Sequence, residues 1–565
     1  MEPRDVFLGS LAARSLARLR GPMIGAMSLV FSFGPAAQGA QAVLQRGYDA
    51  SVSGATLQET TLNATNVSPN TFGLVFTLPV DDNVYAQPLY VPNVVIPGRR
   101  TRNVLCVATM SDTLYGFDAE VGGTALWTVN LARLVNATPV PMAEFAIGGY
   151  LGITGNLGIL STPVIDPSSN VMYVVAATLK AGTIQYRLHA IDITNGAEPY
   201  GPGVLISASY AGSTFDARYQ TQRVSLALAG NQVVFGFGAL ELELPGNYVG
   251  WVMAYNKKTL RQSGVFATVT NGDRGGGVWQ SGRPAAVDRA GYVYVFAGNA
   301  YGGGYDGVHN FSESVLKLDP SHGLQLLDWF TPHNWSYLDA NDLDLTSSGP
   351  LLIPGTMLLA GGGKTGELYV LNTANLGKYN ATDGRVVQEE NITAGGKIRG
   401  GPVYWQRSAA GGGPLLYNWG DDDVLKAYSF SGTQFAANPS AQGTDSAILT
   451  GGILALSANG QHHGSGVLWA MTRSADSEGN SALGELHAFN AEAVSKELWN
   501  STMNATRDGY GNFAKLVPPL IANGRVYVAT FSRQVAVYGL LPQCEHLQSL
   551  QTTPSANRCV DHYAN

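Results

Sequence analysis

The sequence predicts an all-β fold, and three observations support that prediction. Short strands rich in Val, Ile, Leu and Tyr recur after residue 45, and glycine-rich turns separate them. No extended stretch there shows the apolar periodicity of an amphipathic helix. Two sequence markers repeat at intervals of roughly 50 to 75 residues, a period typical of repeat architectures. Together they predict an eight-bladed β-propeller of four-stranded antiparallel blades.

The first marker is a small or polar residue followed by proline at the start of an apolar strand. The second is an apolar strand that ends in Asp or Asn, whose side chains hydrogen-bond the backbone and start turns. In the clearest unit, 84–131, QPLYVPNVVI, NVLCVAT, TLYGFD and TALWTVNL form four consecutive strands. The first marker recurs at Pro88, Pro163, Pro284, Pro350, Pro402 and Pro518, with looser versions at Val224 and Ile453. The second recurs at Asp118, Asp192, Asn256, Asp319, Asn372 and Asn490, with degenerate versions at Ser429 and Gly539.

The two markers alternate along the chain and divide it into eight units. The eighth unit, 516–541, supplies only three strands. The segment FGLVFTLP at 72–79 precedes the first unit, and we predict that this N-terminal strand closes the last blade. Such closure removes the exposed strand edges at which β-proteins aggregate. We therefore predict a propeller over 71–541, after a glycosylatable linker at 43–70 and before a C-terminal tail at 542–565.

The first 42 residues are predicted to be a secretory signal peptide. Arg14, Arg18 and Arg20 precede an apolar run at 23–33, which is too short for the roughly 20 residues that cross a bilayer. Small residues follow, with an A-x-A pattern that ends at Ala42. An organellar transit peptide is the alternative, because the segment is rich in Arg and poor in acids. We expect a protein that is secreted or at the cell surface, without an integral membrane segment.

Sequons and cysteines agree with an oxidising location. Nine N-x-[ST] sequons, mostly in predicted loops, begin at Asn63, Asn66, Asn136, Asn310, Asn334, Asn380, Asn391, Asn500 and Asn504. Cys544 and Cys559 bracket the polar tail, and we expect a disulfide between them. Cys106 lies within a predicted strand and is expected to be a buried free thiol.

The charge balance argues against nucleic acid as a partner. The formal net charge is −7 at pH 7, and charged residues make up 13% of the chain, about half the usual ~25%. We expect a monomer whose partner is an anionic small molecule or an acidic glycan, for the reasons given below.

The unit that ends in FDAEVGGTALW, with Asp118 and Trp127, resembles the repeat of pyrroloquinoline quinone (PQQ) propellers. The wider pattern, which includes GITGNLGILSTPVID and LHAIDITNGAEPYG, is similar to a secreted group within the quinoprotein alcohol dehydrogenase-like superfamily. The resemblance covers nearly the whole chain after residue 42. It implies the propeller fold, and it implies PQQ and calcium as candidate cofactors.

The chain departs from the quinoprotein alcohol dehydrogenases in features that concern chemistry. Those enzymes carry a disulfide between adjacent cysteines beside the cofactor, and this chain has no adjacent cysteines. The tryptophan docking motif is kept only in part, at Trp127, Trp329 and Trp499. A c-type haem motif, C-x-x-C-H, is also lacking. Whether the chain is an enzyme is therefore open.

The innermost strand of each propeller blade lines the axis, so residues at the start of these strands are candidate ligand contacts. Here they are Gln87, Arg223, Trp279, Arg283, Arg399 and Lys515. Four of the six are cations, which would form a cationic funnel for a planar or multiply charged anion. Trp279 would supply a stacking face. PQQ and acidic sugars both match this chemistry. The alternative is that these side chains lie at different depths and pair with local carboxylates.

The segment HNWSYLDANDLDLTSSG concentrates carboxylates at the start of the fifth blade. Asp339, Asp342 and Asp344 are candidate calcium ligands, although their spacing is not that of an EF-hand. Asp342 or Asp344 is also the candidate general base for removing an alcohol proton. The alternative is a loop held by Asx turns.

Two other motifs are interpreted as structural. GGGKTG at 361–366 resembles a P-loop, but Leu358 stands where the first glycine is required and a strand follows, so a hairpin turn is predicted. His462 and His463 have no partner at zinc-ligand spacing and are predicted to lie in a solvated loop. Two functions therefore stay open. One is a ligand-binding or cell-surface module with an axial anion site, and the other is a PQQ- and calcium-dependent dehydrogenase of alcohols or sugars.

Overall fold

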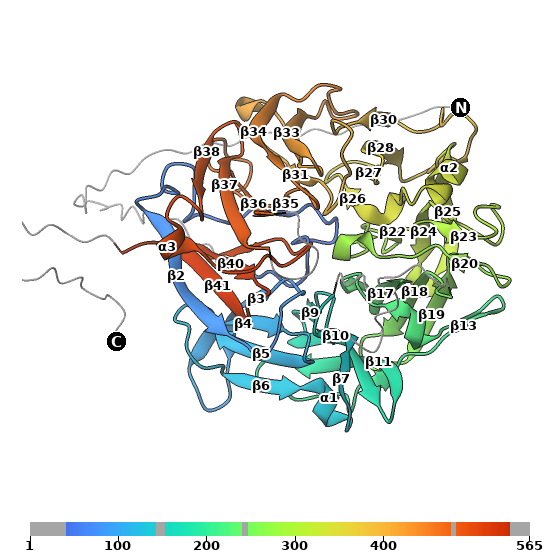
Figure 1. The fold of residues 1–565 in the computed structure, drawn as a ribbon, viewed down its shortest axis with the longest axis horizontal. Coiled ribbons are helices and arrows are strands. Elements are labelled where there is room, and N and C mark those ends of the chain that lie inside the picture. Colours follow the sequence, from blue (N-terminus) through green and yellow to red (C-terminus); the bar gives the residue numbers. More distant parts are fainter. Residues whose placement is uncertain (1–40, 143–152, 240–246, 476–481, 543–565) are drawn as a thin grey trace, which may run out of the picture. The chain divides into compact units, whose positions relative to one another are not determined.

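The computed structural model describes residues 41–142, 153–239, 247–475 and 482–542, all within one compact unit, 40–565. In this part of the chain, eight four-stranded antiparallel blades form a propeller ring with only three short helices (Figure 1). The predicted fold is confirmed. Residues 1–40 of the predicted signal peptide, and the two tail cysteines Cys544 and Cys559, lie outside the described residues.

Blade 1 has the strand order β3 (Leu89–Val95), β4 (Thr101–Ala108), β5 (Thr113–Asp118) and β6 (Trp127–Asn130). These are the four strands predicted from the clearest sequence unit. Cys106 in β4 is a free, buried cysteine, as predicted, and burial raises the pKa of its thiol to about 12.

The other blades repeat this meander. Blade 2 consists of β9 (Val164–Asp166), β10 (Val171–Lys180), β11 (Thr183–Asp192) and β12 (Val204–Leu205), with β7 (Thr138–Pro141) and β8 (Asn156–Leu157) added beside β10. Blade 3 consists of β16 (Ala227–Ala229), β17 (Gln232–Ala239), β18 (Trp251–Asn256) and β19 (Gln262–Ala267), with β15 (Gln220–Thr221) beside β17. Blade 4 consists of β21 (Ala286–Val287), β22 (Val293–Phe296), β24 (Val315–Asp319) and β25 (Gln325–Thr331), with β29 (Lys378–Tyr379) beside β25.

Blades 5 to 8 complete the ring. Blade 5 consists of β26 (Leu351–Leu352), β27 (Leu358–Gly362), β28 (Glu367–Asn372) and β30 (Gln388–Asn391). Blade 6 consists of β31 (Val403–Trp405), β32 (Leu415–Asn418), β33 (Asp423–Ser429) and β34 (Ala441–Ala447). Blade 7 consists of β35 (Ile453–Ser457), β36 (Val467–Arg473), β37 (Gly484–Asn490) and β38 (Glu497–Asn500). Blade 8 consists of β39 (Leu520–Ala522), β40 (Arg525–Ala529), β41 (Gln534–Leu540) and β2 (Phe72–Pro79).

The minor elements lie between and beside the blades. The helices are α1 (Leu131–Leu134), α2 (Trp335–Ala340) and α3 (Ala505–Asp508). Two small two-stranded sheets pair β13 (Ser209–Tyr210) with β14 (Ser213–Thr214), and β20 (Arg274–Gly275) with β23 (Ala300–Tyr301). No helix among the described residues is long and apolar enough to cross a membrane.

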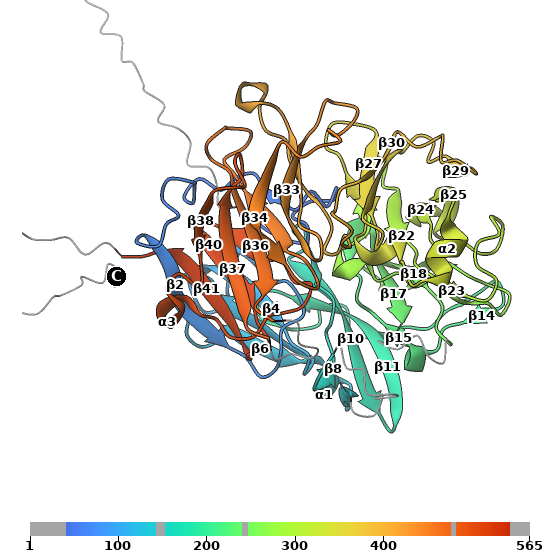
Figure 2. The same ribbon diagram turned by 45° about the horizontal axis from the view of Figure 1, so that its top comes forward.

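The N-terminal strand β2 closes the ring, as predicted. It pairs antiparallel with β41, from Phe72 opposite Leu540 to Pro79 opposite Gln534, and the two strands lie side by side in Figures 1 and 2. Phe72 is fully buried, and its ring centroid lies 5.0 Å from that of Trp499 in blade 7. Burying such an aromatic side chain is worth about 1.5–3 kcal/mol. The closing strand β2 therefore also packs at the interface between blades 7 and 8.

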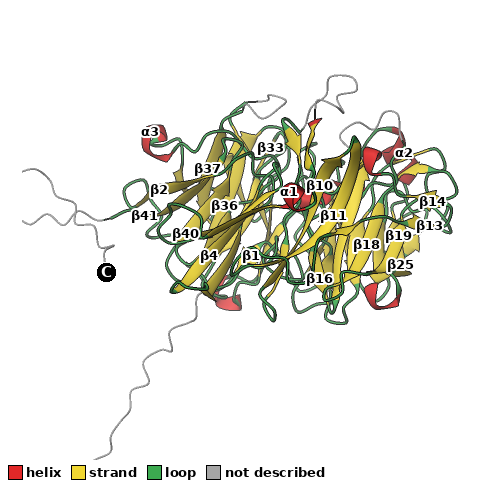
Figure 3. Cartoon of the chain, turned by 90° about the horizontal axis from the view of Figure 1, so that it is seen from below, coloured by secondary structure: helices red, strands yellow, loops and turns green. Residues whose placement is uncertain are grey.

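The hydrophobic core lies at the interfaces between neighbouring blades. Between blades 1 and 2, for example, Val104 and Cys106 pack in one cluster with Met172 and Val174 of β10. The indole nitrogen of Trp127 donates to the Ile193 carbonyl of the next blade at 2.7 Å. Seen from the side, the strands run steeply between the two faces of the ring (Figure 3). Their connecting loops therefore gather at these faces.

The segment 43–59, predicted to be part of a linker, runs instead along the inner edges of the blades. We call these residues the axial strap. Main-chain hydrogen bonds join Val43 to Tyr90, Leu44 to Ile165, Ala50 to Val287, Ser51 to Leu352, Ser53 to Tyr404 and Gly54 to Leu456. The second residue of each pair belongs to the first strand of blade 1, 2, 4, 5, 6 or 7. Within the strap, β1 (Ala55–Thr56) pairs parallel with β35.

The strap also contacts blade 8 through side chains. The Tyr48 hydroxyl accepts a hydrogen bond from Ile521 N at 3.0 Å, and the Glu59 carboxylate accepts one from Gly524 N at 3.0 Å. The linker prediction for this part of 43–70 is therefore wrong. The prediction failed because main-chain groups and small residues make the contacts of the strap. Its sequence therefore lacks the apolar alternation that indicates a strand.

Candidate functional site

A pocket of about 150 Å³ lies where the chain enters the first strands of several blades. Its lining includes four of the predicted ligand contacts, namely Arg223, Trp279, Arg399 and Lys515. These precede β16, β21, β31 and β39, the first strands of blades 3, 4, 6 and 8. Because the first strands surround the propeller axis (Figure 1), the pocket lies at the axis. Trp279 is partly exposed there.

Arg283 is close to this pocket but does not line it. Its side chain is buried, and its guanidinium donates to the carbonyls of Gly400 (3.1 Å) and Pro402 (3.0 Å) in front of blade 6. A third bond, of 2.8 Å, reaches the carbonyl of Val52 in the axial strap. Burial lowers the pKa of Arg283 to about 10. Arg283 therefore fastens the strap to two blades, and its charge lies below the pocket.

Gln87 does not line the pocket either. The residue is buried, and its main-chain N–H donates to Thr162 Oγ1 at 2.9 Å. Neither polar atom of its side-chain amide has a hydrogen-bond partner in the described part of the chain. Blade 1 thus supplies none of the predicted contacts.

Arg46 of the axial strap is a site residue that sequence reasoning missed. Its side chain is only 4% exposed, and its guanidinium donates to the carbonyls of Ser281 (2.8 Å) and Leu516 (2.7 Å). Leu516 itself lines the pocket. Burial first, and then the nearby charges of Arg283 and Arg223, lower the pKa of Arg46 to about 9. Arg46 therefore bonds a residue of the pocket lining, although its own side chain does not line the pocket.

Arg46 and Arg283 are buried cations, and the negative charge of Asp49 acts on Arg283 without forming an ion pair with it. No ion pair between described residues joins either guanidinium to a carboxylate, and the bonds given above all run to main-chain carbonyls. Burying a charge without an ion partner costs free energy. An anion bound in the pocket above them would offset that cost, so the site is electrostatically suited to an anion.

Lys364 is a second site residue that the sequence interpretation missed. The β27–β28 hairpin, predicted from GGGKTG, carries it to the pocket wall beside Asp344. Its ammonium lies 2.6 Å from Asp344 Oδ2 and 2.6 Å from Asp342 Oδ1. Burial opposes the charged ammonium, but the two carboxylates outweigh this effect and raise the pKa of Lys364 above its ordinary value. Asp342, Lys364 and Asp344 are therefore held together at the pocket wall by two ion pairs, as an acid–base–acid triplet.

The predicted calcium ligands are each engaged elsewhere. Asp342 and Asp344 bind Lys364, and Asp344 Oδ1 also accepts Asn299 N at 3.1 Å. Asp339 accepts Ala300 N at 3.0 Å and the Ser312 hydroxyl at 2.9 Å, and burial raises the pKa of Asp339 to about 6. Among the described residues, the one group of three His, Cys, Asp or Glu ligand atoms lies elsewhere, at His333, Asp383 and Glu389. Asp342 and Asp344 thus meet at Lys364, and no group of three ligand atoms found among the described residues unites them with Asp339.

Glu313 lies behind this wall and is fully buried. Its Oε2 accepts Leu345 N at 2.6 Å. Burial, followed by the charge of Asp344, raises the pKa of Glu313 well above its ordinary value. The neutral form of this carboxyl is therefore favoured.

Arg399 fits the predicted alternative of local pairing. Its Nε donates to Asp421 Oδ2 at 2.8 Å while the side chain still lines the pocket. The bonded carboxylate fixes the guanidinium and offsets part of its charge.

Two further predictions can be compared with the structure. Asn310 is buried, its Oδ1 accepts Thr270 N at 2.9 Å and its amide donates to Asp273 Oδ2 at 2.6 Å, so the folded chain has no room for a glycan there. None of the other eight sequon asparagines is buried. His462 and His463 are exposed, in agreement with a solvated loop.

Comparisons with known proteins identify the fold. No protein-family model matches the chain, and no curated protein matches its sequence. A quinohemoprotein alcohol dehydrogenase from Pseudomonas putida superposes with a TM-score of 0.52 at 15% identity, over 91% of this chain and 82% of that one. A quinohemoprotein alcohol dehydrogenase from Comamonas testosteroni gives 0.51 at 15% identity, over 88% and 80%. A europium-containing methanol dehydrogenase gives 0.52 at 12% identity, over 88% and 98%. The likeness to these dehydrogenases therefore concerns the fold, at low sequence identity.

Proposed function

We propose that the axial pocket binds a planar anion with several carboxylates, and that PQQ is this ligand. The observation that carries the proposal is the convergence of Arg223, Arg399 and Lys515 on one cavity with the indole of Trp279. Arg46 lies beneath, without a carboxylate partner among the described residues. Guanidinium groups recognise carboxylates through paired hydrogen bonds, and an indole stacks on a flat ring.

The residues fit the two implied cofactors unequally. The cations and Trp279 suit PQQ, which carries carboxylates on a flat ring system. A calcium ion would need several oxygen ligands, but Asp344 is the only carboxylate lining the described pocket and it is paired with Lys364. We therefore propose PQQ binding and derive no step that involves calcium.

The proposed activity is an oxidoreductase that acts on an alcohol or a sugar. The similarity to alcohol and methanol dehydrogenases favours this reaction class, and bound PQQ would accept the electrons from the substrate. Trp279 would orient the ring, and Arg223 and Lys515 would neutralise its carboxylates. Asp344, held in place by Lys364 and by Asn299 N, would take the proton from the substrate hydroxyl.

A non-catalytic ligand-binding or cell-surface module is the second candidate. The Asp342–Lys364–Asp344 triplet favours it, because the only carboxylate at the pocket is already ion-paired and no calcium ligand set surrounds the ligand position in the described residues. The ligand of such a module would again be anionic, for example an acidic glycan.

We further propose that the protein is secreted and glycosylated. The charge and hydropathy pattern of the first 42 residues and the sequons outside Asn310 support this location. Expression in a eukaryotic host should yield protein in the medium whose mass falls on treatment with an N-glycosidase. Retention in the cell without glycans would contradict it.

A turnover measurement distinguishes the dehydrogenase from the non-catalytic module. We expect PQQ to bind the purified chain at micromolar concentration and to support reduction of an artificial dye with a panel of alcohols and sugars. Binding without dye reduction, with or without added calcium, would leave the module. Failure of PQQ to bind would overturn the proposed ligand.

A further inference from the structure

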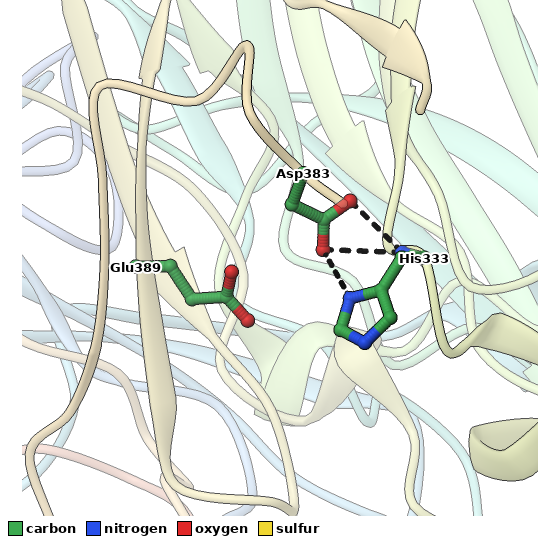
Figure 4. A group of neighbouring side chains, drawn as sticks. All are labelled: His333, Asp383 and Glu389. Atoms are coloured by element: carbon green, nitrogen blue, oxygen red, sulfur yellow. Dashed lines mark hydrogen bonds and ion pairs between the residues drawn. The ribbon is translucent and has the colours of Figure 1, made fainter. Parts of the chain in front are cut away.

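His333, Asp383 and Glu389 form a cluster away from the axial pocket (Figure 4). His333 follows β25 of blade 4, Asp383 lies in the loop before β30, and Glu389 belongs to β30 of blade 5. One ligand atom from each residue lies within 4.8 Å of the other two. Three segments from two blades thus bring three metal-ligating groups together.

The His333–Asp383 pair is well ordered by its own hydrogen bonds. The main-chain N–H of His333 donates to both carboxylate oxygens of Asp383, at 2.9 and 3.1 Å, and ring Nδ1 lies 2.8 Å from Oδ2. The Asp383 side chain is 1% exposed, whereas that of His333 is 45% exposed. A buried carboxylate therefore fixes a histidine that solvent can reach. Figure 4 shows the carboxylate of Glu389 directed toward this pair.

The cluster has more negative than positive charge. Among the described residues, no lysine or arginine forms an ion pair with Asp383 or Glu389, and His333 is the one basic partner of Asp383. Glu367 adds a further negative charge nearby. Asp383, His333 and Glu367 all lie close enough to act electrostatically on Glu389. A cation bound among these groups would relieve this repulsion.

We propose that this cluster binds a divalent transition-metal ion, with Zn²⁺ as the best match, through His333, Asp383 and Glu389. An imidazole nitrogen with two carboxylates suits zinc, whereas calcium and magnesium take oxygen ligands only. His333 would give up the Nδ1 proton as the metal takes the place of the hydrogen bond to Asp383. Water would occupy the remaining coordination position.

Such an ion would join the outer strands of blades 4 and 5. The two blades already meet here, because β29 from the blade 5 connection pairs parallel with β25. A metal bound to His333 and Glu389 would add a second link between the same segments. Binding would therefore stabilise the folded chain as well as occupy a site.

The test is calorimetric titration of the full chain with ZnCl₂ after chelator treatment and dialysis. We expect one zinc ion per chain, and loss of a ligand in His333→Ala or Glu389→Gln should weaken binding by at least about tenfold. His322→Ala is the matched control, because His322 pairs with Asp319 at 2.7 Å in the same way but has no third ligand. A double variant, His462→Ala with His463→Ala, controls for adventitious binding by the exposed pair.

Thermal unfolding gives an independent readout. Zinc should raise the Tm of the wild type and of both controls, and should leave the Tm of His333→Ala unchanged. The proposal is overturned if zinc fails to bind, if His333→Ala binds as tightly as the wild type, or if the His462/His463 double variant abolishes binding.

Discussion

The guanidinium of Arg46 donates to the main-chain carbonyl of Leu516 at 2.7 Å, across 470 residues of sequence. Arg46 belongs to the axial strap, and Leu516 lines the axial pocket immediately ahead of blade 8. A residue near the start of the described chain thus bonds the lining of a pocket whose walls come from much later blades.

Replacing Arg46 with Met should weaken binding of an anionic ligand. The change keeps an extended side chain but removes a buried charge below the pocket. A charge pair several ångströms apart in a partly buried environment is worth about 1–2 kcal/mol, so we expect about a tenfold loss in affinity for PQQ. Arg100→Met is the control, because it removes an equal charge from an exposed turn and should leave affinity unchanged. Equal effects of the two variants would show that only the net charge matters.

Trp279 should supply the stacking face. Replacing it with Ala should weaken PQQ binding by about 0.5–1.5 kcal/mol, or roughly 2- to 10-fold, while Phe should retain part of the affinity. PQQ should quench indole fluorescence in the wild type and in Trp335→Phe, a control on α2 outside the pocket lining. Unchanged quenching in Trp279→Phe would place the ligand elsewhere.

Lys364 should control the charge of the pocket wall. In Lys364→Met, the carboxylates of Asp342 and Asp344 lose their shared cation, so the wall becomes negative and repels an anion. We expect a loss of affinity that the double variant Lys364→Met, Asp344→Asn partly restores, because the second change removes the carboxylate charge that lines the pocket. Titration of both variants with PQQ measures this coupling. Additive losses would contradict it.

Asp112 should make stability depend on pH. It is fully buried, neither carboxylate oxygen has a hydrogen-bond partner among the described residues, and burial followed by the charge of Asp81 raises its pKa well above the ordinary value. Between the unfolded and folded pKa values the native state binds more protons than the unfolded state. The free energy of unfolding therefore falls as pH rises through that window, by about 1.4 kcal/mol per pH unit.

Asp112→Asn removes this dependence because the amide cannot ionise, and Asn tolerates the φ of 59° at this position. Urea unfolding should show the variant to be more stable than the wild type at pH 8 and similar to it near pH 4. Asp422→Asn is the control, since Asp422 has a φ of 51° but is exposed. Parallel pH profiles for the wild type and Asp112→Asn would refute the assignment.

The fold was predictable because each blade repeats the same local chemistry. Proline before an apolar strand and Asp or Asn after one mark the register of most units, looser versions mark the others, and β2 was recognisable as the missing strand. Aligning the first strands also found Arg223, Trp279, Arg399 and Lys515, since equivalent positions in a propeller face the same axis.

Other parts of the site lacked such a signal. Arg46 is carried by the axial strap, which is held by main-chain hydrogen bonds and so has no strand pattern in its sequence. Lys364 lies in a hairpin turn, and its side chain reaches the pocket only because the blades are arranged around a common axis. Gln87 holds the position equivalent to the other candidates, but its side chain is buried away from the pocket. Depth along a strand is set by packing between blades, which local sequence does not encode.

The central claim is that the axial pocket is a site for a planar polyanion. Titration of the full chain with PQQ, in the wild type and in the double variant Arg223→Met, Lys515→Met, tests it most directly. The account predicts one PQQ per chain at micromolar affinity, weakened by added salt and by at least about tenfold in the double variant. An unchanged affinity in the double variant, or no binding to the wild type, would contradict it.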